Sequence, residues 1–288
     1  MKLINLIPIT VNANFLKFRK VGYFIYAFLI IASVALLATK SLNFGIDFTG
    51  GIVVEIKTDE SIESLRSRLN KFDPELQTFG EDLVSIRLPA AGDNEEAQMA
   101  KLSELRAELG EGVEYRNIEV VGPKVGGELI TDGILAFLIA MLAIALYIWV
   151  RFDFAFGFTA LLGLFADLIL TLGFLSLTQI QFSLVSVAAI LTMVGYSIND
   201  TVVIFDRIRE NTKKYKNKPK KEIIDLSMNE MFARTVSTSL TTVIAILAIT
   251  IWGGAVLQTL AYPLLFGVTA GVFSSIFVAA PLLLNFKD

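Results

Sequence analysis

The sequence contains no cysteine and no histidine among its 288 residues. Disulfide bonds are therefore excluded, and so are the metal sites that cysteine and histidine build. Histidine is also the one side chain whose ordinary pKa lies close to neutral pH. A side-chain proton carrier near neutral pH must then be a carboxylate whose pKa is raised, or a lysine whose pKa is lowered.

Charge is scarce as well: 18% of the residues are charged, whereas 54% are hydrophobic. A typical soluble domain has about 25% charged residues. The mean hydropathy is +0.64, which favours a membrane protein over a soluble one.

Six segments are apolar over the roughly 17–25 residues that a helix needs to cross a bilayer core. A helix is the expected form because it satisfies its own backbone hydrogen bonds in lipid. Residues 1–20 carry basic side chains and no acid, and no convincing cleavage site follows, so we expect an uncleaved first span. The predicted spans are residues 21–38, 129–150, 154–177, 182–205, 235–252 and 257–284.

Lysine and arginine gather on one side of these spans. They occur in residues 1–20, at Arg151, throughout residues 206–234 and at Lys287, whereas the short loops on the other side carry no charge. Because positively charged loops stay in the cytoplasm, we expect both termini there. This predicts a cytoplasmic N-terminus (1–20), a first span (21–39), an extracytoplasmic domain (40–128), spans two to four (129–205), a basic cytoplasmic loop (206–234), and spans five and six with a short C-terminus (235–288).

The extracytoplasmic segment is polar and acidic. Its patterns predict strands at 52–57, 83–88 and 113–121, helices at 61–72 and 94–109, and a further strand near 76–79. This order is typical of a small ferredoxin-like α+β sandwich. The predicted fold class is a membrane bundle of six transmembrane helices with one such domain.

The basic loop ends in an amphipathic pattern. Apolar residues lie near one helical face of residues 222–234, which predicts a helix on the membrane surface. A charged linker is the alternative. The apolar residues are Ile223, Ile224, Met228, Met231 and Phe232.

Charges inside the spans are the sharpest functional signal. An aspartate at a helix centre costs about 2.5–3.5 kcal/mol to insert, so Asp200 and Asp167 demand a partner or a role. Asp200 lies roughly 9 Å inside the fourth span, and Arg234 opens the fifth, so the two side chains are able to meet. An aspartate that alternates between an ionised paired form and a protonated form would couple proton uptake to helix movement. A static ion pair, or a hydrated aspartate, is the alternative.

Hydroxyl side chains follow Arg234 in the fifth span, where they could relay protons or bond across helices. These candidates are Thr238, Ser239, Thr241 and Thr242. Two intramembrane aspartates also raise the possibility of a protease with paired carboxylates. The residues before Asp200, Ser197 to Asn199, lack the Gly-x-Gly-Asp motif of that family.

Small residues form two kinds of feature. Gly50, Gly51, Gly126 and Gly127 flank the external domain as turns, which are either hinges or simple chain reversals. A second set in the sixth span is suited to close helix contact, with a partner in this chain or another. That set is Gly267, Gly271 and Ser275.

Several motifs together resemble the SecD/SecF family, and the resemblance covers nearly the whole chain. The single external domain and short N-terminus favour the SecF branch. The matching motifs are Gly45-Ile46-Asp47-Phe48-Thr49-Gly50-Gly51, Val121-Gly122-Pro123-Lys124-Val125-Gly126, Arg151-Phe152, residues 195–211 around Asn199-Asp200-Thr201, and Arg234-Thr235 with the hydroxyl residues after it.

The resemblance implies a twelve-span unit of the resistance-nodulation-division superfamily, to which this chain gives six spans and SecD the others. It implies a bacterial inner-membrane complex with the SecYEG channel, YajC and the preprotein driven by SecA, in which the proton-motive force promotes export. It implies no enzymatic activity, cofactor, metal or nucleic acid. The family's intramembrane acid and arginine fall on Asp200 and Arg234. The third-span acid falls on Asp167, preceded here by Ala166 where the family often has histidine.

Two other functions stay open. One is a translocon scaffold without its own proton coupling. The other is a small-molecule exporter of the same superfamily, although such exporters usually carry two large external domains and twelve spans in one chain.

Overall fold

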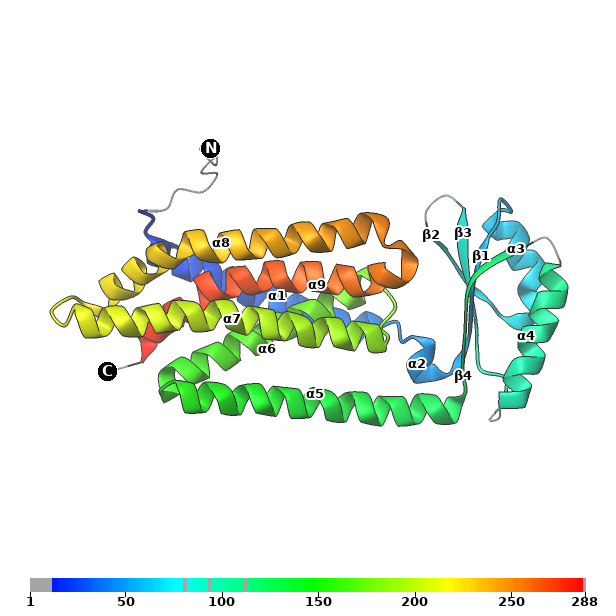
Figure 1. The fold of residues 1–288 in the computed structure, drawn as a ribbon, viewed down its shortest axis with the longest axis horizontal. Coiled ribbons are helices and arrows are strands. Elements are labelled where there is room, and N and C mark those ends of the chain that lie inside the picture. The colour runs from blue at the N-terminus through cyan, green and yellow to red at the C-terminus, as the bar shows by residue number, and fades with distance from the viewer. Residues whose placement is uncertain (1–11, 80–81, 93–94, 111–112, 287–288) are drawn as a thin grey trace. The chain divides into compact units, whose positions relative to one another are not determined.

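A computed structural model describes residues 12–79, 82–92, 95–110 and 113–286, so Lys2 and Lys287 lie outside the described residues. The chain divides into two compact units, a helix bundle and a sheet domain. Within the described residues, six helices are long and apolar enough to cross a membrane, as predicted. They are α1 (Arg19–Lys40), α5 (Pro123–Arg151), α6 (Phe154–Thr178), α7 (Leu184–Lys214), α8 (Lys220–Trp252) and α9 (Gly254–Ser274) (Figure 1).

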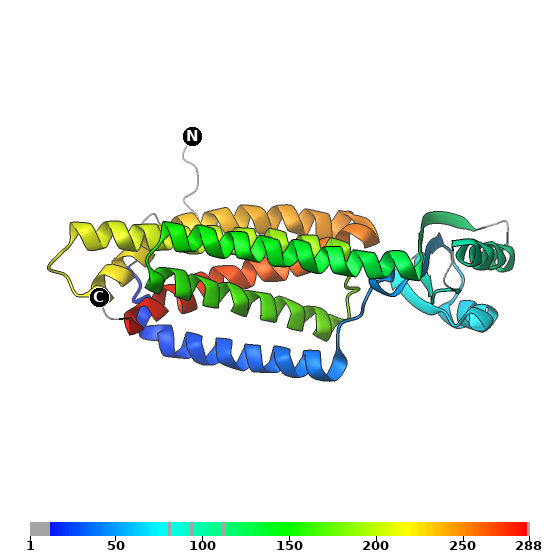
Figure 2. The ribbon, with the colours of Figure 1, turned by 90° about the horizontal axis from the view of Figure 1, so that it is seen from below.

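The bundle has inner and outer helices. Helix α1 packs on α6, α6 on α9, and α9 on α8, an order that Figure 2 shows from below. About half or more of the residues in the spans of α6, α7 and α9 are buried, whereas fewer than a fifth are buried in the spans of α1, α5 and α8. Apolar side chains on the outer helices are suited to contact with lipid.

Small residues let α9 approach α7 closely. A Cβ at Gly271 would lie 2.8 Å from Oγ of Ser197, and one at Gly267 would overlap the side chain of Met193. The small-residue face of α9 therefore packs against α7 of the same chain. The side chains of Met193 and Ser197 leave no room for a larger residue at Gly267 or Gly271.

The sheet domain contains four antiparallel strands in the order β2-β3-β1-β4. The helices α3 (Ile62–Leu69) and α4 (Glu95–Leu109) cover one face (Figure 1). Alternating side chains such as Ile52, Val54 and Ile56 are fully buried, as a half-buried strand requires. This is the predicted ferredoxin-like arrangement. The strands are β1 (Gly51–Lys57), β2 (Glu75–Phe79), β3 (Leu83–Leu88) and β4 (Glu114–Val121).

The glycines at the two ends of this domain differ in their surroundings. Gly51 has a φ of +135°, and a Cβ there would lie 2.5 Å from the carbonyl oxygen of Leu88. A Cβ at Gly126 would lie 3.3 Å from the carbonyl oxygen of Asp47 and the nitrogen of Gly50, whereas Gly127 has no described neighbour within 4 Å. Gly51 and Gly126 are thus each closely surrounded, Gly126 by the backbone around Gly50, whereas Gly127 has space for a side chain.

The predicted basic loop is mostly helical. Helix α7 continues to Lys214, and α8 begins at Lys220 and runs unbroken into the fifth span. Ile224 and Met228 are buried in a cluster with Phe205 and Ile208 of α7. The expectation of a separate helix on the membrane surface is therefore wrong, because the apolar face packs against α7 rather than against lipid.

The segment 13–18, which precedes α1, is bound to this part of α8. The side-chain amide of Asn229 accepts from the nitrogen of Ala13 and donates to its carbonyl oxygen, both at 2.8 Å. Oδ1 of Asp225 accepts from the nitrogen of Leu16 at 3.2 Å, in the short helix η1 (Phe15–Phe18). Phe15 and Leu16 are buried, so polar and apolar contacts together hold this segment on the bundle.

Candidate functional site

Asp200 lies on α7 with 3% of its surface exposed. Its Oδ2 accepts a hydrogen bond from Oγ of Ser239 on α8 at 3.1 Å. The carboxylate is therefore held between two membrane helices by a neutral hydroxyl. A buried carboxylate needs hydrogen-bond partners, and here a serine hydroxyl from the neighbouring helix supplies one.

Asp167 on α6 is completely buried. Oγ of Ser197 on α7 and Oγ of Ser274 on α9 each donate to its Oδ2 at 2.7 Å. Its Oδ1 has no hydrogen-bond partner among the described residues. One carboxylate thus joins the three inner helices and keeps one oxygen available to hold a proton.

A helical irregularity adjoins this cluster. Ser275 starts a π-helical turn, η3 (Ser275–Ala279), between α9 and α10 (Ala280–Leu282). Its Oγ lies 2.8 Å from Oγ1 of Thr201, the residue after Asp200. Turns of this kind often occur at functional sites, and here the turn brings two adjacent serines of α9 to α6 and α7.

Arg234 lies on the exposed side of α8. No ion pair within 4.0 Å joins it to Asp200 in the part of the chain that the structure describes. The hydroxyl of Thr238 donates to the backbone carbonyl oxygen of Arg234 at 3.1 Å. This hydrogen bond lies within α8 and does not join it to α7.

The predicted hydroxyl residues fall into two groups. Ser239 and Thr242 face α7, where Thr242 donates to the phenolic oxygen of Tyr196 at 2.9 Å. Thr238 and Thr241 are exposed and donate to backbone carbonyls of α8. The structure therefore brings Ser239 and Thr242 to the aspartate-bearing helix and leaves the other two outside this interface.

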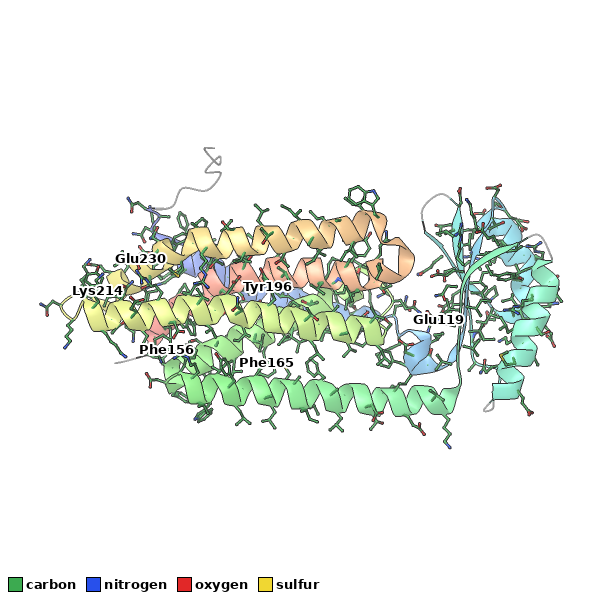
Figure 3. All side chains as sticks on the ribbon, in the orientation of Figure 1. Glu119, Phe156, Phe165, Tyr196, Lys214 and Glu230 are labelled. Carbon is green, nitrogen blue, oxygen red and sulfur yellow. The ribbon has the colours of Figure 1, made fainter. Side chains whose placement is uncertain are left out.

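Polar contacts continue along α7 and α8 toward the loop that joins them. Nε of Arg207 lies 2.6 Å from Oε2 of Glu230, and Asn211 donates to Ser227 at 2.9 Å and to Glu230 at 2.7 Å. Together with the Tyr196–Thr242 and Asp200–Ser239 contacts, these pairs form an antiparallel series, here called the α7–α8 polar ladder. Figure 3 places Tyr196 along the middle of α7 and Glu230 near the loop end of α8.

The loop end of the bundle is also cross-linked by charge. Asp206 accepts from Arg151 of α5 at 2.7 Å and pairs with Arg209 at 3.2 Å. Nη1 of Arg209 also donates to the carbonyl oxygen of Arg151 at 3.1 Å. These half-exposed pairs fix the ends of α5 and α7 rather than neutralise the buried aspartates.

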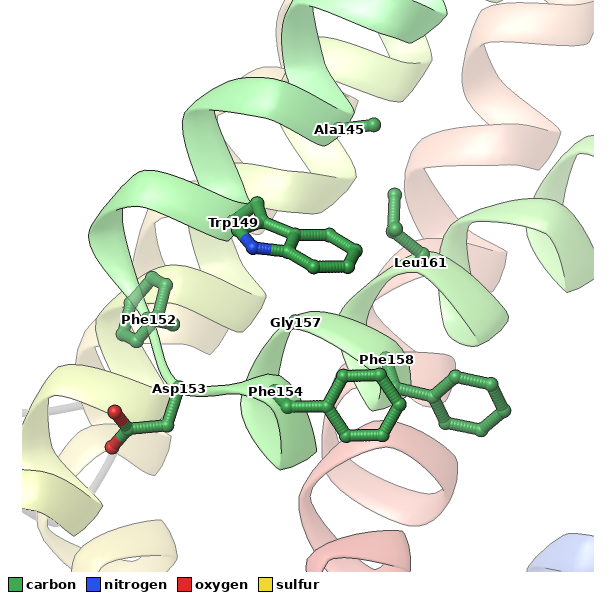
Figure 4. A pocket seen from close by; sticks show the side chains of 8 residues that line it. All are labelled: Ala145, Trp149, Phe152, Asp153, Phe154, Gly157, Phe158 and Leu161. Atoms are coloured by element: carbon green, nitrogen blue, oxygen red, sulfur yellow. The ribbon is translucent and has the colours of Figure 1, made fainter.

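A hollow between α5 and α6 is less suited to charge chemistry. Trp149 and Phe154 stand at its rim, and Phe158 lines it beside Leu161 (Figure 4). Trp149 and Phe154 are mostly exposed, and Asp153 is the one charged lining residue. The hollow is an apolar surface of the kind that contacts lipid chains, with a tryptophan of the type found at membrane interfaces.

Sequence reasoning missed several partners at this site. Ser197 and Ser274 bond Asp167, and Tyr196 bonds Thr242, but none of the three was expected to take part. Ser197 and Tyr196 lie one turn from Asp200 on α7. The four-residue spacing of Tyr196 and Asp200 was an available signal for a shared helix face. Within the described residues there is no group of three or more acidic side chains able to hold a metal ion.

Comparison with known proteins agrees with this architecture. The family model of the protein export membrane protein SecD/SecF, C-terminal, matches residues 101–288, and the SecD/SecF GG motif matches residues 35–62. The protein translocase subunit SecF of Rickettsia rickettsii is 42% identical, covering 99% of this chain and 95% of the relative. That of Rickettsia bellii is 40% identical, covering 99% and 97%.

Two solved structures are similar as well. The crystal structure of SecDF from Thermus thermophilus matches with a TM-score of 0.86 and 32% identity, over 97% of this chain and 39% of that one. SecDF in its super-membrane-facing form matches with a TM-score of 0.71 over the same shares. The chain thus spans well under half the length of the solved SecDF chains, but nearly the whole length of the SecF relatives. With the glycine turn, the six long helices and the ferredoxin-like domain already in place, these matches show that the chain belongs to the SecD/SecF family.

Proposed function

We propose that this chain is an accessory subunit of the Sec preprotein translocase and uses the proton-motive force, together with SecD, to promote protein export. The observation that carries the proposal is Asp200, a carboxylate buried between α7 and α8 with a serine hydroxyl as its partner. Such a group changes charge when a proton binds, and this change alters the balance of forces between the two helices. One charge crossing the membrane supplies about 2.3 kcal/mol per 100 mV.

Arg234 is proposed to modulate Asp200 in another state of the cycle. Its long side chain starts from the next helix, and in the present state it is exposed. A rotation or slide of α8 would bring the guanidinium toward the carboxylate and favour the ionised form. Ser239 and Thr242 are proposed as relay hydroxyls that face α7, with Thr238 and Thr241 serving on the outer side of α8.

The orientation proposed is both termini in the cytoplasm, with residues 40–128 outside a bacterial inner membrane. Basic side chains at the loop end of α7 and α8 support it through the positive-inside rule. The acidic outer domain would then contact the emerging chain or SecD. The glycines Gly50, Gly51, Gly126 and Gly127 are proposed to let this domain move relative to the membrane.

The partners proposed are SecD and the SecYEG channel, with YajC, membrane lipid and the SecA-driven preprotein. The names of the relatives support a role in protein export over the export of small molecules.

The test measures preprotein export into proteoliposomes that hold the chain with SecD and SecYEG, driven by SecA and ATP. Asp200→Asn should abolish the gain that a proton-motive force gives, while complex assembly stays intact. Asp153→Asn, at the surface before α6, is the matched control and should keep the gain. A normal gain in Asp200→Asn would contradict the proposal.

A structural function is favoured for one residue. Asp167 bonds two serines on two other helices, which is the arrangement expected of a static clamp. In Asp167→Asn the amide oxygen still accepts from both serines. A clamp therefore predicts normal export in this variant, whereas a second proton site predicts that the gain is lost.

A further inference from the structure

Thr235 has a buried hydroxyl without a partner. The residue is 1% exposed, and its Oγ1 has no hydrogen bond among the described residues. The other threonines of α8 all donate to a backbone carbonyl, to Tyr196, or to both; they are Thr238, Thr241, Thr242 and Thr250. Thr235 is therefore the exception in its own helix, and buried hydroxyls in this situation commonly bind water.

Its position on the α7–α8 polar ladder is informative. Thr235 precedes Ser239, the partner of Asp200, by one helical turn, so the two hydroxyls lie on the same face about 6 Å apart along α8. The next contact toward the loop is the Arg207–Glu230 pair. The antiparallel register of the ladder places Ile204 of α7 near this level, and Ile204 is buried and apolar.

Water is the remaining partner for this hydroxyl. No described protein atom bonds Oγ1 of Thr235, and buried waters make hydrogen bonds to unsatisfied polar groups of this kind. A water bonded to Thr235 would lie on the face of α8 that Ser239 shares, which is the face turned toward Asp200.

We propose that Thr235 holds a water molecule that carries the proton of Asp200 toward the loop end of the bundle. This rests on the proposed function of Asp200. In the step, the neutral acid of Asp200 gives its proton to the water oxygen and becomes a carboxylate. The hydronium formed in this way gives one of its protons to a solvent water on the loop side and becomes water again, so that atoms and charge balance. Thr235 touches the water and not the preprotein, and is a positioning residue.

The first measurement is proton flux through proteoliposomes that hold the chain with SecD. Thr235→Val keeps the shape of the side chain and removes the hydroxyl, so flux should fall about tenfold. Thr235→Ser should retain it. The control Thr250→Val, in which the lost hydroxyl bonds a backbone carbonyl, should behave as the parent protein.

The second measurement does not depend on transport. An infrared difference spectrum between the acid and alkaline forms, recorded in ordinary water and in water enriched in oxygen-18, should show a water band that shifts with the isotope. The band should disappear in Thr235→Val and persist in Thr235→Ser. An unchanged band, or parental flux, in Thr235→Val would overturn the inference. Parental flux in Asp200→Asn would instead overturn the proposed function, and the infrared result would still decide whether Thr235 binds water.

Discussion

The sheet domain and the helix bundle bury different kinds of side chain. Among the described residues, Gln98 is the one polar side chain that the sheet domain buries, within an otherwise apolar core. The bundle buries many polar side chains, and most of them bond across helices or to their own backbone. They include Asp167, Thr171, Ser176, Ser197, Asp200, Thr201, Asn211, Ser227, Ser239, Ser274 and Ser275.

The difference follows from the solvent on each side of the fold. In water, burial of apolar surface drives folding, so the sheet domain is stabilised by residues such as Ile86 and Leu105. In lipid, the surroundings of a helix are as apolar as its neighbours, so contact depends on close packing of small residues and on hydrogen bonds. Three substitution pairs and one single substitution test this contrast, from the largest expected effect to the smallest.

Ile86→Ala should destabilise the sheet domain by about 2–5 kcal/mol, because Ile86 is fully buried between neighbouring strands and the helices. Leu146→Ala on α5 removes a similar side chain that is 57% exposed, and should change the stability of the bundle by less than about 0.5 kcal/mol. Amide hydrogen exchange of the full chain in detergent measures both. Equal effects in the two units would contradict the contrast.

Gly267→Leu should destabilise the bundle by about 1–3 kcal/mol, because the new side chain would overlap Met193. Gly195→Leu on α7 is the control, since a Cβ at Gly195 meets nothing within 4 Å. That change should be neutral or stabilising by up to about 1 kcal/mol, because leucine is the better helix former. The melting temperature should therefore fall in purified Gly267→Leu and stay the same or rise in purified Gly195→Leu.

Gln98→Leu should stabilise the sheet domain by about 1–2 kcal/mol. Both polar atoms of the Gln98 amide are buried and without a hydrogen-bond partner among the described residues, and an apolar side chain removes this penalty. Gln77→Leu on the exposed side of β2 should give no gain. Amide hydrogen exchange should become slower in Gln98→Leu and stay unchanged in Gln77→Leu. A loss of stability in Gln98→Leu would contradict the prediction and show that the Gln98 amide stabilises the domain.

Glu55→Gln tests the opposite face of the same sheet. Burial, and then the charge of Glu119, raise the pKa of Glu55 above its ordinary value of 4.5. A raised pKa means that the protonated form stabilises the fold, so this contribution is complete below about pH 4.5 and is lost as the pH rises through the raised value. The variant should be more stable than the parent at neutral pH, by less than about 1 kcal/mol because Glu55 is half exposed, and less dependent on pH above 4.5. Thermal unfolding at a series of pH values measures this.

The sequence predicts the helices and strands of this molecule better than it predicts the contacts between their side chains. The alternation of apolar and polar residues at Leu83–Leu88 predicted β3, because a strand that is buried on one face has an apolar residue at every second position. The order of the elements predicted the ferredoxin-like sheet. The aspartates stood out since charge is rare in apolar spans. Their partners Ser197 and Ser274 did not, because serine is unremarkable in a membrane helix and its role depends on which helices become neighbours.

The same reason explains the error at residues 222–234. An amphipathic pattern shows that one face is covered, but it does not distinguish lipid from another helix. The unpredicted extension of α7 to Lys214 provides that second helix, and Ile224 and Met228 pack against it.

The attachment of the N-terminal segment to α8 sets an order of assembly during synthesis. Ala13 and Asn229 are 216 positions apart, so their contact waits for nearly four-fifths of the chain to be made. At 5–20 residues per second, the delay is roughly 10–40 s. During that time the first helix lacks the neighbours that later elements provide. Closure of this contact is thus a late event in biogenesis, because it requires the first turns of α8 to have been synthesised.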